Sequence, residues 1–386
     1  MSGSKLSCAL LGGWAALAGV AAAQPAEAIS FELAYTADVM GVIDGGLAKR
    51  GRVLDNFDLL LDADLERLLR WRGASAHFHL LNNSGAMPNN DAGTLQGVNN
   101  IEVAGQHLRL FEAWIEQAFG AASVRFGLYD LNSEFYVNDS AGALIAPAFG
   151  IGSEIAATGP NGPSIFPSTA IAVRFGARFG ENGYARAAFL NAAAGVPGDP
   201  HGVDTSFDEG ALGIAEAGFE AEGKLAIGVW RYTRRQDDIR DLNGSGDPVQ
   251  RIAQGAYVVY EQPLNDPGAA RAATAFVRAG VSDGDTTPFS GGWQAGVLVR
   301  RVFEGRPDSL LSLGVNQGLL SEGYRRNRID LGASMANAEM QAELTYSDRL
   351  SPHVTVQPDL QYIRRPGGER SIEDAVVAGV RVTIDL

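Results

Sequence analysis

Glu112, Trp114 and Glu116 are the residues whose types and spacing point most directly to chemistry at a binding site. Alternate residues of a β-strand project to one face, so two carboxylates and an indole would share that face. Carboxylates accept hydrogen bonds from hydroxyl groups and pair with guanidinium groups, and an indole offers an apolar surface for stacking. If the intervening residues face lipid, this trio faces water, and those intervening residues are Phe111, Ala113 and Ile115.

Further charged and polar residues follow in positions that could extend this face. A guanidinium on the next strand could pair with the two acids across the strand boundary. A second group of polar residues lies at the start of the loop after that strand, and two arginines share one face of a later strand. The full set of candidate residues is Glu112, Trp114, Glu116, Arg125, Asp130, Asn132, Glu134, Arg174 and Arg178.

Strands must position these side chains, and the C-terminal stretch shows the pattern best. From Val380 to Leu386, apolar residues alternate with Arg381, Thr383 and Asp385. A period of two indicates a strand with one apolar face and one polar face. The same alternation recurs along the chain and predicts about sixteen strands, which begin near Ser30, Val53, Gly73, His107, Ser123, Thr169, Tyr184, Phe207, Lys224, Arg251, Arg271, Gly291, Ser309, Glu339, Val354 and Val376.

The connections between these strands alternate between short and long. Short or intermediate turns alternate with five long segments, which are Asn82 to Gln106, Leu131 to Ser168, Ala194 to Ser206, Gln236 to Gln250 and Gly318 to Ala338. Short turns at one end and long loops at the other are typical of outer-membrane barrels, and an even strand count leaves both termini on the periplasmic side. The predicted fold class is therefore all-β, a transmembrane antiparallel β-barrel of about sixteen strands.

The segment from Leu131 to Ser168 is long enough to be functional. Its apolar stretch, Ala141 to Ile151, would be unusual on an arch exposed to water. Folding inward to narrow the barrel would bury that stretch, so we expect a constriction loop. Contact with a neighbouring subunit is the alternative explanation.

The N-terminus resembles a secretory signal peptide. Lys5 precedes an apolar run from Ala9 to Ala23, which is too short for a spanning helix. We expect cleavage after Ala23, with Ala28 as the alternative, which leaves residues 24–386 as one barrel domain. The single cysteine, Cys8, would be removed with the signal.

Composition excludes several classes of function. A formal net charge of −14 argues against nucleic acid as a partner. A mature chain without cysteine has no disulfide, thiolate metal site or cysteine nucleophile. No nucleotide, cofactor or metal-ligand motif is evident, and no G-x-S-x-G sequence is present, so we expect neither a cofactor nor enzymatic activity.

The chain resembles the carbohydrate-selective porins of the OprB family over almost its whole mature length. The matching residues are E-A-W-I-E-Q from Glu112, R-F-G-L-Y-D-L-N-S-E-F from Arg125, G-R-P-D from Gly305, and Q-P-D-L-Q-Y-I from Gln357 followed by P-G-G, with Y-T-A-D from Tyr35 and the pair Gly45-Gly46. The resemblance implies a sixteen-stranded porin in the outer membrane of a Gram-negative bacterium. Such a porin passes small sugars by diffusion, is surrounded by outer-membrane lipid and, by analogy, forms a homotrimer.

A sugar pore would use the candidate residues in a defined way. Sugars are neutral, with hydroxyls that donate and accept hydrogen bonds and with an apolar C–H face. The acids and arginines would bind hydroxyls, and Trp114 would stack on the ring. Two other functions stay open on the sequence alone, namely a barrel-embedded lipase and a soluble periplasmic sugar-binding β-protein.

Overall fold

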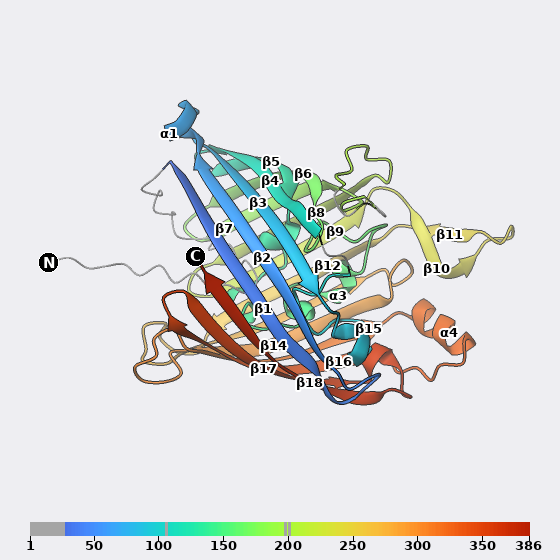
Figure 1. The fold of residues 1–386 in the computed structure, drawn as a ribbon. Helices are drawn as coiled ribbons and strands as arrows, with labels where there is room; N and C mark the ends of the chain where they lie inside the picture. The colour runs from blue at the N-terminus through green and yellow to red at the C-terminus, as the bar shows by residue number, and fades with distance from the viewer. Residues whose placement is uncertain (1–27, 105–106, 197–198, 200–201) are drawn as a thin grey trace.

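The computed structural model describes residues 28–104, 107–196, 199 and 202–386. The predicted signal peptide, residues 1–23, lies outside them. Within the described chain, sixteen antiparallel strands form one closed barrel (Figure 1). The barrel strands are β1 (Ile29–Gly46), β2 (Gly51–Asp64), β3 (Ala74–Gly85), β4 (His107–Phe119), β5 (Ala122–Tyr129), β6 (Ala170–Phe179), β7 (Gly183–Asn191), β8 (Ala211–Glu220), β9 (Lys224–Tyr232), β12 (Gln254–Pro263), β13 (Ala272–Ser282), β14 (Phe289–Arg300), β15 (Leu310–Leu320), β16 (Ala338–Ser351), β17 (Val354–Arg364) and β18 (Glu373–Asp385).

Each strand pairs with its neighbour in sequence, except that β9 pairs with β12, and the barrel closes where β1 pairs with β18. At this seam Ala34 lies opposite Asp385 and Met40 opposite Gly379. Closure leaves no unpaired strand edge, which is what a sheet needs to span lipid. The prediction of a sixteen-stranded antiparallel barrel is confirmed.

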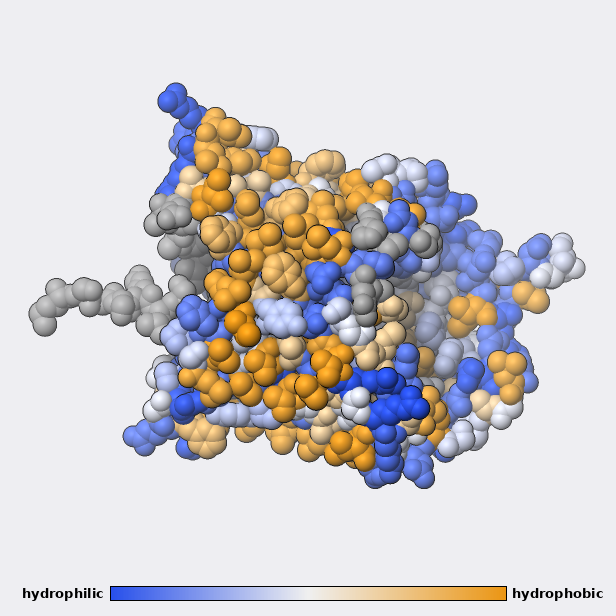
Figure 2. Space-filling model, viewed as in Figure 1, coloured by the Kyte–Doolittle hydropathy of each residue, from blue (hydrophilic) through white to orange (hydrophobic). Residues whose placement is uncertain are grey.

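The two faces of the barrel wall differ as the alternation predicts. Val39, Phe126 and Ile227 are each about 60% exposed, at 60%, 63% and 62%. Gln361 and Arg381 point inward and are buried. Figure 2 shows apolar side chains gathered over the middle of the strands, with hydrophilic residues at both ends. The outer face therefore suits lipid, and the polar face lines the lumen.

Short or intermediate turns join the strands at the end of the barrel where β1 begins and β18 ends, and the longest connections lie at the other end, where only the turn from β1 to β2 is very short (Figure 1). At a short turn such as that after β4, Gly120 takes a positive φ of 67° that suits glycine. The predicted loop from Gln236 to Gln250 is instead largely a hairpin, of β10 (Gln236–Leu242) and β11 (Pro248–Arg251), which stands away from the barrel.

The helices of the described chain are short and lie in the connections, apart from the barrel strands. None of them is long and apolar enough to cross a membrane. They are α1 (Leu65–Leu69), α2 (Asn89–Ala92), α3 (Ser153–Ala156) and α4 (Glu322–Asp330), with 3-10 turns η1 (Leu131–Ser133), η2 (Asp139–Ala141), η3 (Pro147–Phe149) and η4 (Pro366–Gly368).

The β5–β6 loop (residues 130–169) folds into the lumen, as predicted for a constriction loop. Its apolar stretch is buried, with Ile145 1% and Phe149 2% exposed. The backbone N–H groups of Ile145 and Ala146 both donate to Glu343 on β16. The loop therefore crosses the lumen from β5 to the opposite wall.

Arg278 on β13 is the main cation that holds this loop. It is 1% exposed, and its Nη1 donates to the carbonyl oxygens of Tyr136 at 2.8 Å and Gly150 at 2.9 Å, while its Nη2 donates to that of Phe149. Glycines on the wall make room for the loop. A Cβ at Gly280 would lie 1.9 Å from Glu154 Oε1, which is shorter than any allowed van der Waals distance.

We expect Arg278→Ala to loosen the β5–β6 loop while the barrel still assembles. Hydrogen bonds to charged groups contribute about 1.5–3 kcal/mol, and here several buried carbonyls would lose their partner at once. The variant should show a higher single-channel conductance and a lower melting temperature in detergent.

Arg326→Ala is the matched control, because Arg326 pairs with Glu322 on the exposed helix α4, and such surface pairs contribute little to stability. If Arg278→Ala has the conductance of the unmodified barrel, Arg278 does not hold the loop in place.

Candidate functional site

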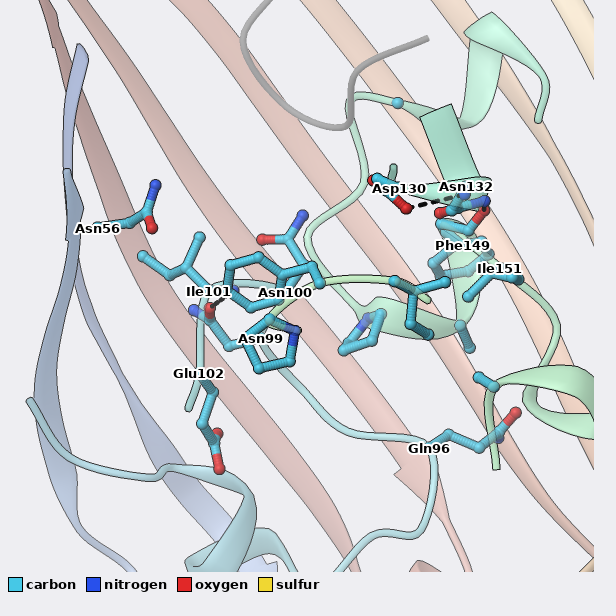
Figure 3. Close-up of a pocket in the computed structure, with 18 of the residues that line it drawn as sticks. Asn56, Gln96, Asn99, Asn100, Ile101, Glu102, Asp130, Asn132, Phe149 and Ile151 are labelled. Atoms are coloured by element: carbon cyan, nitrogen blue, oxygen red, sulfur yellow. Dashed lines mark hydrogen bonds between the residues drawn. The ribbon is translucent and has the colours of Figure 1, made fainter. Parts of the chain in front are cut away.

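A cavity of about 430 Å³ lies inside the barrel between two inward-folded loops (Figure 3). One is the β5–β6 loop and the other is the β3–β4 loop, which the structure describes over residues 86–104. Strands β1 to β4, β14 and β18 supply the rest of its wall. The cavity is therefore bounded both by the barrel wall and by the two loops inside the lumen.

The polar lining of the cavity is rich in uncharged amides. Asp130 and Asn132, both predicted from sequence, lie here, and Asp130 caps η1 by accepting from the Asn132 N–H at 2.8 Å. Amides both donate and accept, so they can bind a neutral hydroxyl in either sense. The lining amides are Asn56, Gln96, Asn99, Asn100, Asn132 and Asn138.

Aromatic rings form the apolar part of the lining. Phe111 and Phe166 lie edge to face with centroids 6.2 Å apart, and Phe149 and Phe289 also border the cavity. The sequence pattern placed Phe111 toward lipid, and this was wrong, because Phe111 is 5% exposed and faces the lumen. The register between β3 and β4 shifts between His79 and Leu80, so Phe111 is the extra residue of a bulge. Ile115, beyond the bulge, faces outward as expected.

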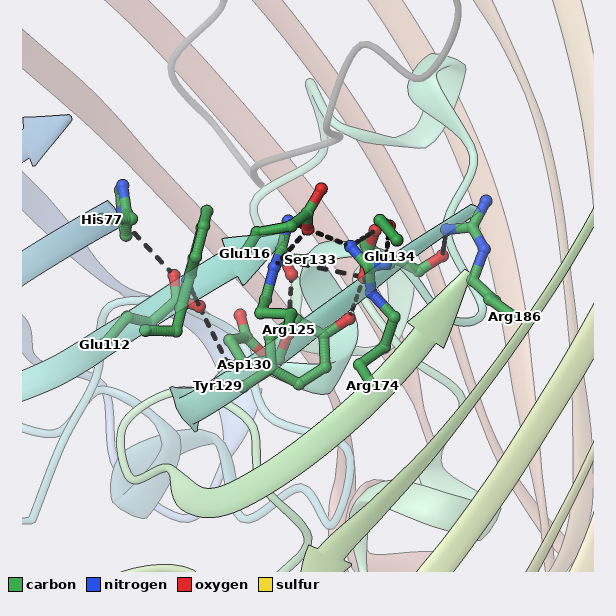
Figure 4. A network of polar contacts seen from close by, with 12 residues as sticks. His77, Glu112, Glu116, Arg125, Tyr129, Asp130, Ser133, Glu134, Arg174 and Arg186 are labelled. Atoms are coloured by element: carbon green, nitrogen blue, oxygen red, sulfur yellow. Dashed lines mark hydrogen bonds and ion pairs between the residues drawn. The ribbon is translucent and has the colours of Figure 1, made fainter. Parts of the chain in front are cut away.

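Beside the cavity, the wall of β4 to β6 carries a network of alternating charges (Figure 4). Arg125 Nε donates to Glu116 at 2.9 Å, which confirms the predicted pairing across β4 and β5. Arg174 on β6 also bonds Glu116 and donates to Glu134 Oε2 at 2.8 Å. Glu134 belongs to the β5–β6 loop, so the network fixes the start of that loop against the wall.

Trp114 lies between two partners from the strands on either side of β4. The imidazole of His77 on β3 stacks with the indole at a centroid distance of 5.0 Å. The guanidinium carbon of Arg125 on β5 lies 3.7 Å from the ring centroid. The indole Nε1 donates to Glu112 at 3.2 Å. The indole therefore packs in the wall between a ring and a cation, and does not present an open face to the cavity.

The structure brings eight of the nine predicted residues together. Glu112 links the network to the cavity, because its Oε1 also accepts from the N–H of Asp130 at 3.1 Å. Arg178 is the exception. It shares the lumenal face of β6 with Arg174 but is exposed near the turn after β6 and pairs in register with Tyr184.

Sequence reasoning missed the polar cluster on the other side of the cavity. Arg381 on β18 donates from Nε and Nη2 to Asp38 on β1, each at 2.8 Å, and both side chains are buried. Asn99 also donates to Asp38, and Asn100 accepts from Arg381 at 2.7 Å. The alternation around Arg381 was visible in the sequence, but nothing there indicated its partner in the first strand.

Burial and charge shift the pKa values of loop carboxyls in opposite directions. Burial alone would raise the pKa of Glu134, but Arg125, Arg174 and Arg186 outweigh it and lower the pKa to about 2. Burial raises the pKa of Glu102, at the edge of the cavity, to about 7, against the hydrogen bond from the Asn89 N–H. Glu134 therefore stays ionised at neutral pH, whereas Glu102 titrates there.

One group of side chains in the part of the chain that the structure describes has the residue types and spacing to hold a metal ion. His77, His79 and Glu112 could each offer one ligand atom, and these atoms lie within 4.8 Å of one another. His79 borders the cavity.

Comparison with known proteins gives one consistent result. The sequence profile of the carbohydrate-selective porin family OprB matches residues 48–386. Porin B of Pseudomonas aeruginosa is 26% identical over 394 residues, which cover 91% of this chain and 86% of that protein. The putative porin QuiX of Acinetobacter baylyi is 21% identical over 393 residues, covering 91% and 89%. The high-pH structure of Pseudomonas putida OprB superposes with a TM-score of 0.83 at 23% identity, over 93% of this chain and 94% of that one.

The titration of Glu102 gives a testable pH dependence. Its pKa is raised, so the carboxyl is neutral at pH 6 and becomes charged as the pH passes through about 7. The added negative charge on the cavity wall should raise the preference for cations over anions between pH 6 and pH 8, measured as reversal potential in a salt gradient.

Glu102→Gln should remove that part of the pH dependence. The pKa of Asp139 is raised to about 6, first by burial and then by Glu261, so a smaller step near pH 6 would persist in the variant. A Glu102→Gln barrel that keeps the full change between pH 6 and pH 8 would show that another group controls the selectivity.

Proposed function

This chain belongs to the OprB family of carbohydrate-selective porins, and we propose that its sugars cross the barrel through the cavity between the β3–β4 and β5–β6 loops. The protein is an outer-membrane β-barrel porin of the Gram-negative type, and it acts as a channel rather than as an enzyme. The lipase and the soluble sugar-binding protein are therefore excluded. The homotrimer stays a prediction.

The composition of the cavity lining carries the proposal. A sugar is neutral but needs a hydrogen-bond partner for each hydroxyl that loses water. The lining offers six amides together with Asp58 and Asp130 as acceptors and Arg381 as a donor. Amides match neutral hydroxyls without adding a net charge that would favour ions over sugars.

The aromatic rings of the cavity supply the apolar contact that a sugar ring needs. Phe111 lines the cavity beside the carboxylate-bonded His79, at a centroid distance of 5.1 Å from that imidazole. In our proposal the C–H face of the sugar contacts Phe111, because Trp114 is covered by His77 and Arg125. Aromatic contacts contribute about 1 kcal/mol, which is weak enough for the sugar to leave.

The charged network has a separate role in this proposal. Glu116, Arg125, Glu134 and Arg174 are largely bonded to one another, and so they hold the loop and set the local field. Glu112 connects both parts, since it bonds Trp114 in the wall and the Asp130 N–H at the cavity. Sugar therefore meets Asp130 and Asn132, while Arg125 and Arg174 act mainly on ions.

Phe111→Ala should weaken sugar binding several-fold, which corresponds to about 1 kcal/mol of lost aromatic contact. The measurement is sugar-induced block of single-channel current, followed by liposome swelling with a graded series of sugars. Phe126→Ala is the matched control, because Phe126 faces lipid on the outer wall and is 63% exposed.

Trp114→Ala should act differently, because it removes the indole that packs against the guanidinium of Arg125. We therefore expect a larger change in the preference between cations and anions than in sugar block. If Trp114→Ala weakens sugar block while Phe111→Ala leaves it unchanged, the sugar contacts the indole and the proposed path is misplaced. If liposomes that contain the unmodified porin swell with none of the sugars, the proposal that sugars pass through the barrel is wrong.

A further inference from the structure

Two histidines and a glutamate meet on the lumenal face of β3 and β4. His77 and His79 are two residues apart on one strand, and His79 pairs in register with Glu112 on the next. His77 Nε2 lies 3.9 Å from Glu112 Oε2 (Figure 4), and the three ligand atoms lie within 4.8 Å of one another. Imidazole nitrogen and carboxylate oxygen are ordinary ligands of Zn²⁺.

Hydrogen bonds to neighbouring groups orient each of the three side chains. His77 Nδ1 bonds Asp62 at 2.7 Å, and His79 Nε2 bonds Asp58 at 2.8 Å. Glu112 Oε1 accepts from Trp114 and from the Asp130 N–H, which leaves Oε2 directed toward His77. A carboxylate that orients a ligating histidine is the arrangement that supports metal sites, because it fixes the ring and increases its basicity.

We propose that His77, His79 and Glu112 bind a divalent transition-metal ion, with Zn²⁺ as the type, and that the bound ion slows the passage of sugar. Bonds of about 2.0–2.2 Å in a tetrahedron require ligand atoms about 3.4 Å apart. The present separations are 4.8 Å or less, so the ligand atoms must move closer together by about 1.4 Å at most when the ion binds. Water takes the fourth position, as in an open site.

The location explains the effect on transport. His79 and its partner Asp58 both line the cavity, so an ion held there adds positive charge and bound water at the cavity wall. Asp62 is half exposed on the other side of His77, which gives the ion a hydrated route of entry. Mg²⁺ and Ca²⁺ prefer all-oxygen coordination and should not compete. Metal binding is independent of the sugar path proposed above, whereas the slowing of sugar passage rests on it.

The binding test uses the folded barrel in detergent, titrated with Zn²⁺ by calorimetry and with Co²⁺ by visible absorption. We expect one ion per barrel, a tetrahedral Co²⁺ spectrum, and no signal from Mg²⁺. The double variant His77→Gln/His79→Gln keeps polar partners for Asp62 and Asp58 but removes both imidazoles, and it should lose binding by at least about 100-fold. Asp58→Asn should weaken binding about 10–100-fold, the usual cost of removing an orienting partner.

His353→Gln is the matched control, since His353 lies in the short turn before β17 and bonds the carbonyl oxygen of Asp385. It should bind Zn²⁺ like the unmodified barrel, and heat-modifiable migration on gels should show all variants folded. Absence of one-to-one binding at millimolar Zn²⁺ would overturn the proposal, as would a folded double variant that binds like the unmodified protein.

The transport test is liposome swelling by a sugar with and without saturating Zn²⁺. Slower swelling in the unmodified porin, and no change in the double variant, is the expected result. Equal swelling with bound Zn²⁺ would overturn the effect on transport and would place the sugar path away from β3. A separate measurement tests the sugar path: if Phe111→Ala leaves sugar block unchanged in metal-free buffer, the proposed path is wrong.

Discussion

The loops inside the barrel depend on charged side chains of the wall for the hydrogen bonds that water no longer supplies to their backbone. Glu339 accepts from the N–H groups of Leu95 and Gln96 in the β3–β4 loop, and Glu343 does the same for the β5–β6 loop. Arg278 donates hydrogen bonds to backbone carbonyl oxygens of the β5–β6 loop. An unpaired buried group costs about 1–3 kcal/mol, so these contacts determine where each loop can rest. The shape of the cavity follows from the positions of ionisable residues on the strands behind it.

Pairing of opposite charges also compensates part of the acidity of the chain on the wall beside the cavity. The formal charge is −14, yet the guanidiniums of Arg125 and Arg174 face the carboxylates of Glu116 and Glu134 at bonding distance. Charges paired in this way are already compensated, and they project only a short-range field into the water beside them. Uncharged amides are the largest group of polar residues in the lining of the neighbouring cavity.

Period-two alternation was enough to predict sixteen barrel strands, and the short turn after β4 fixed the register that pairs Arg125 with Glu116. It failed where the backbone departs from that period. The inserted residue Phe111 turned inward at a bulge, which no count of alternating residues reveals. The β10–β11 hairpin lacks an apolar face, so its charged sequence resembled a loop. The inward course of the β3–β4 loop was also missed, because its polar residues are typical of exposed loops and several of its partners lie more than 200 residues away.

The ion pair between Asp38 and Arg381 joins the first strand to the last, and Asn99 and Asn100 of the β3–β4 loop bond to it directly. One half of that anchor is made early in synthesis and the other half only when β18 is complete. The contacts of the β3–β4 loop with this ion pair are therefore complete only when β1 and β18 are paired. The seam that seals the wall against lipid is thus also one of the supports of the cavity inside it.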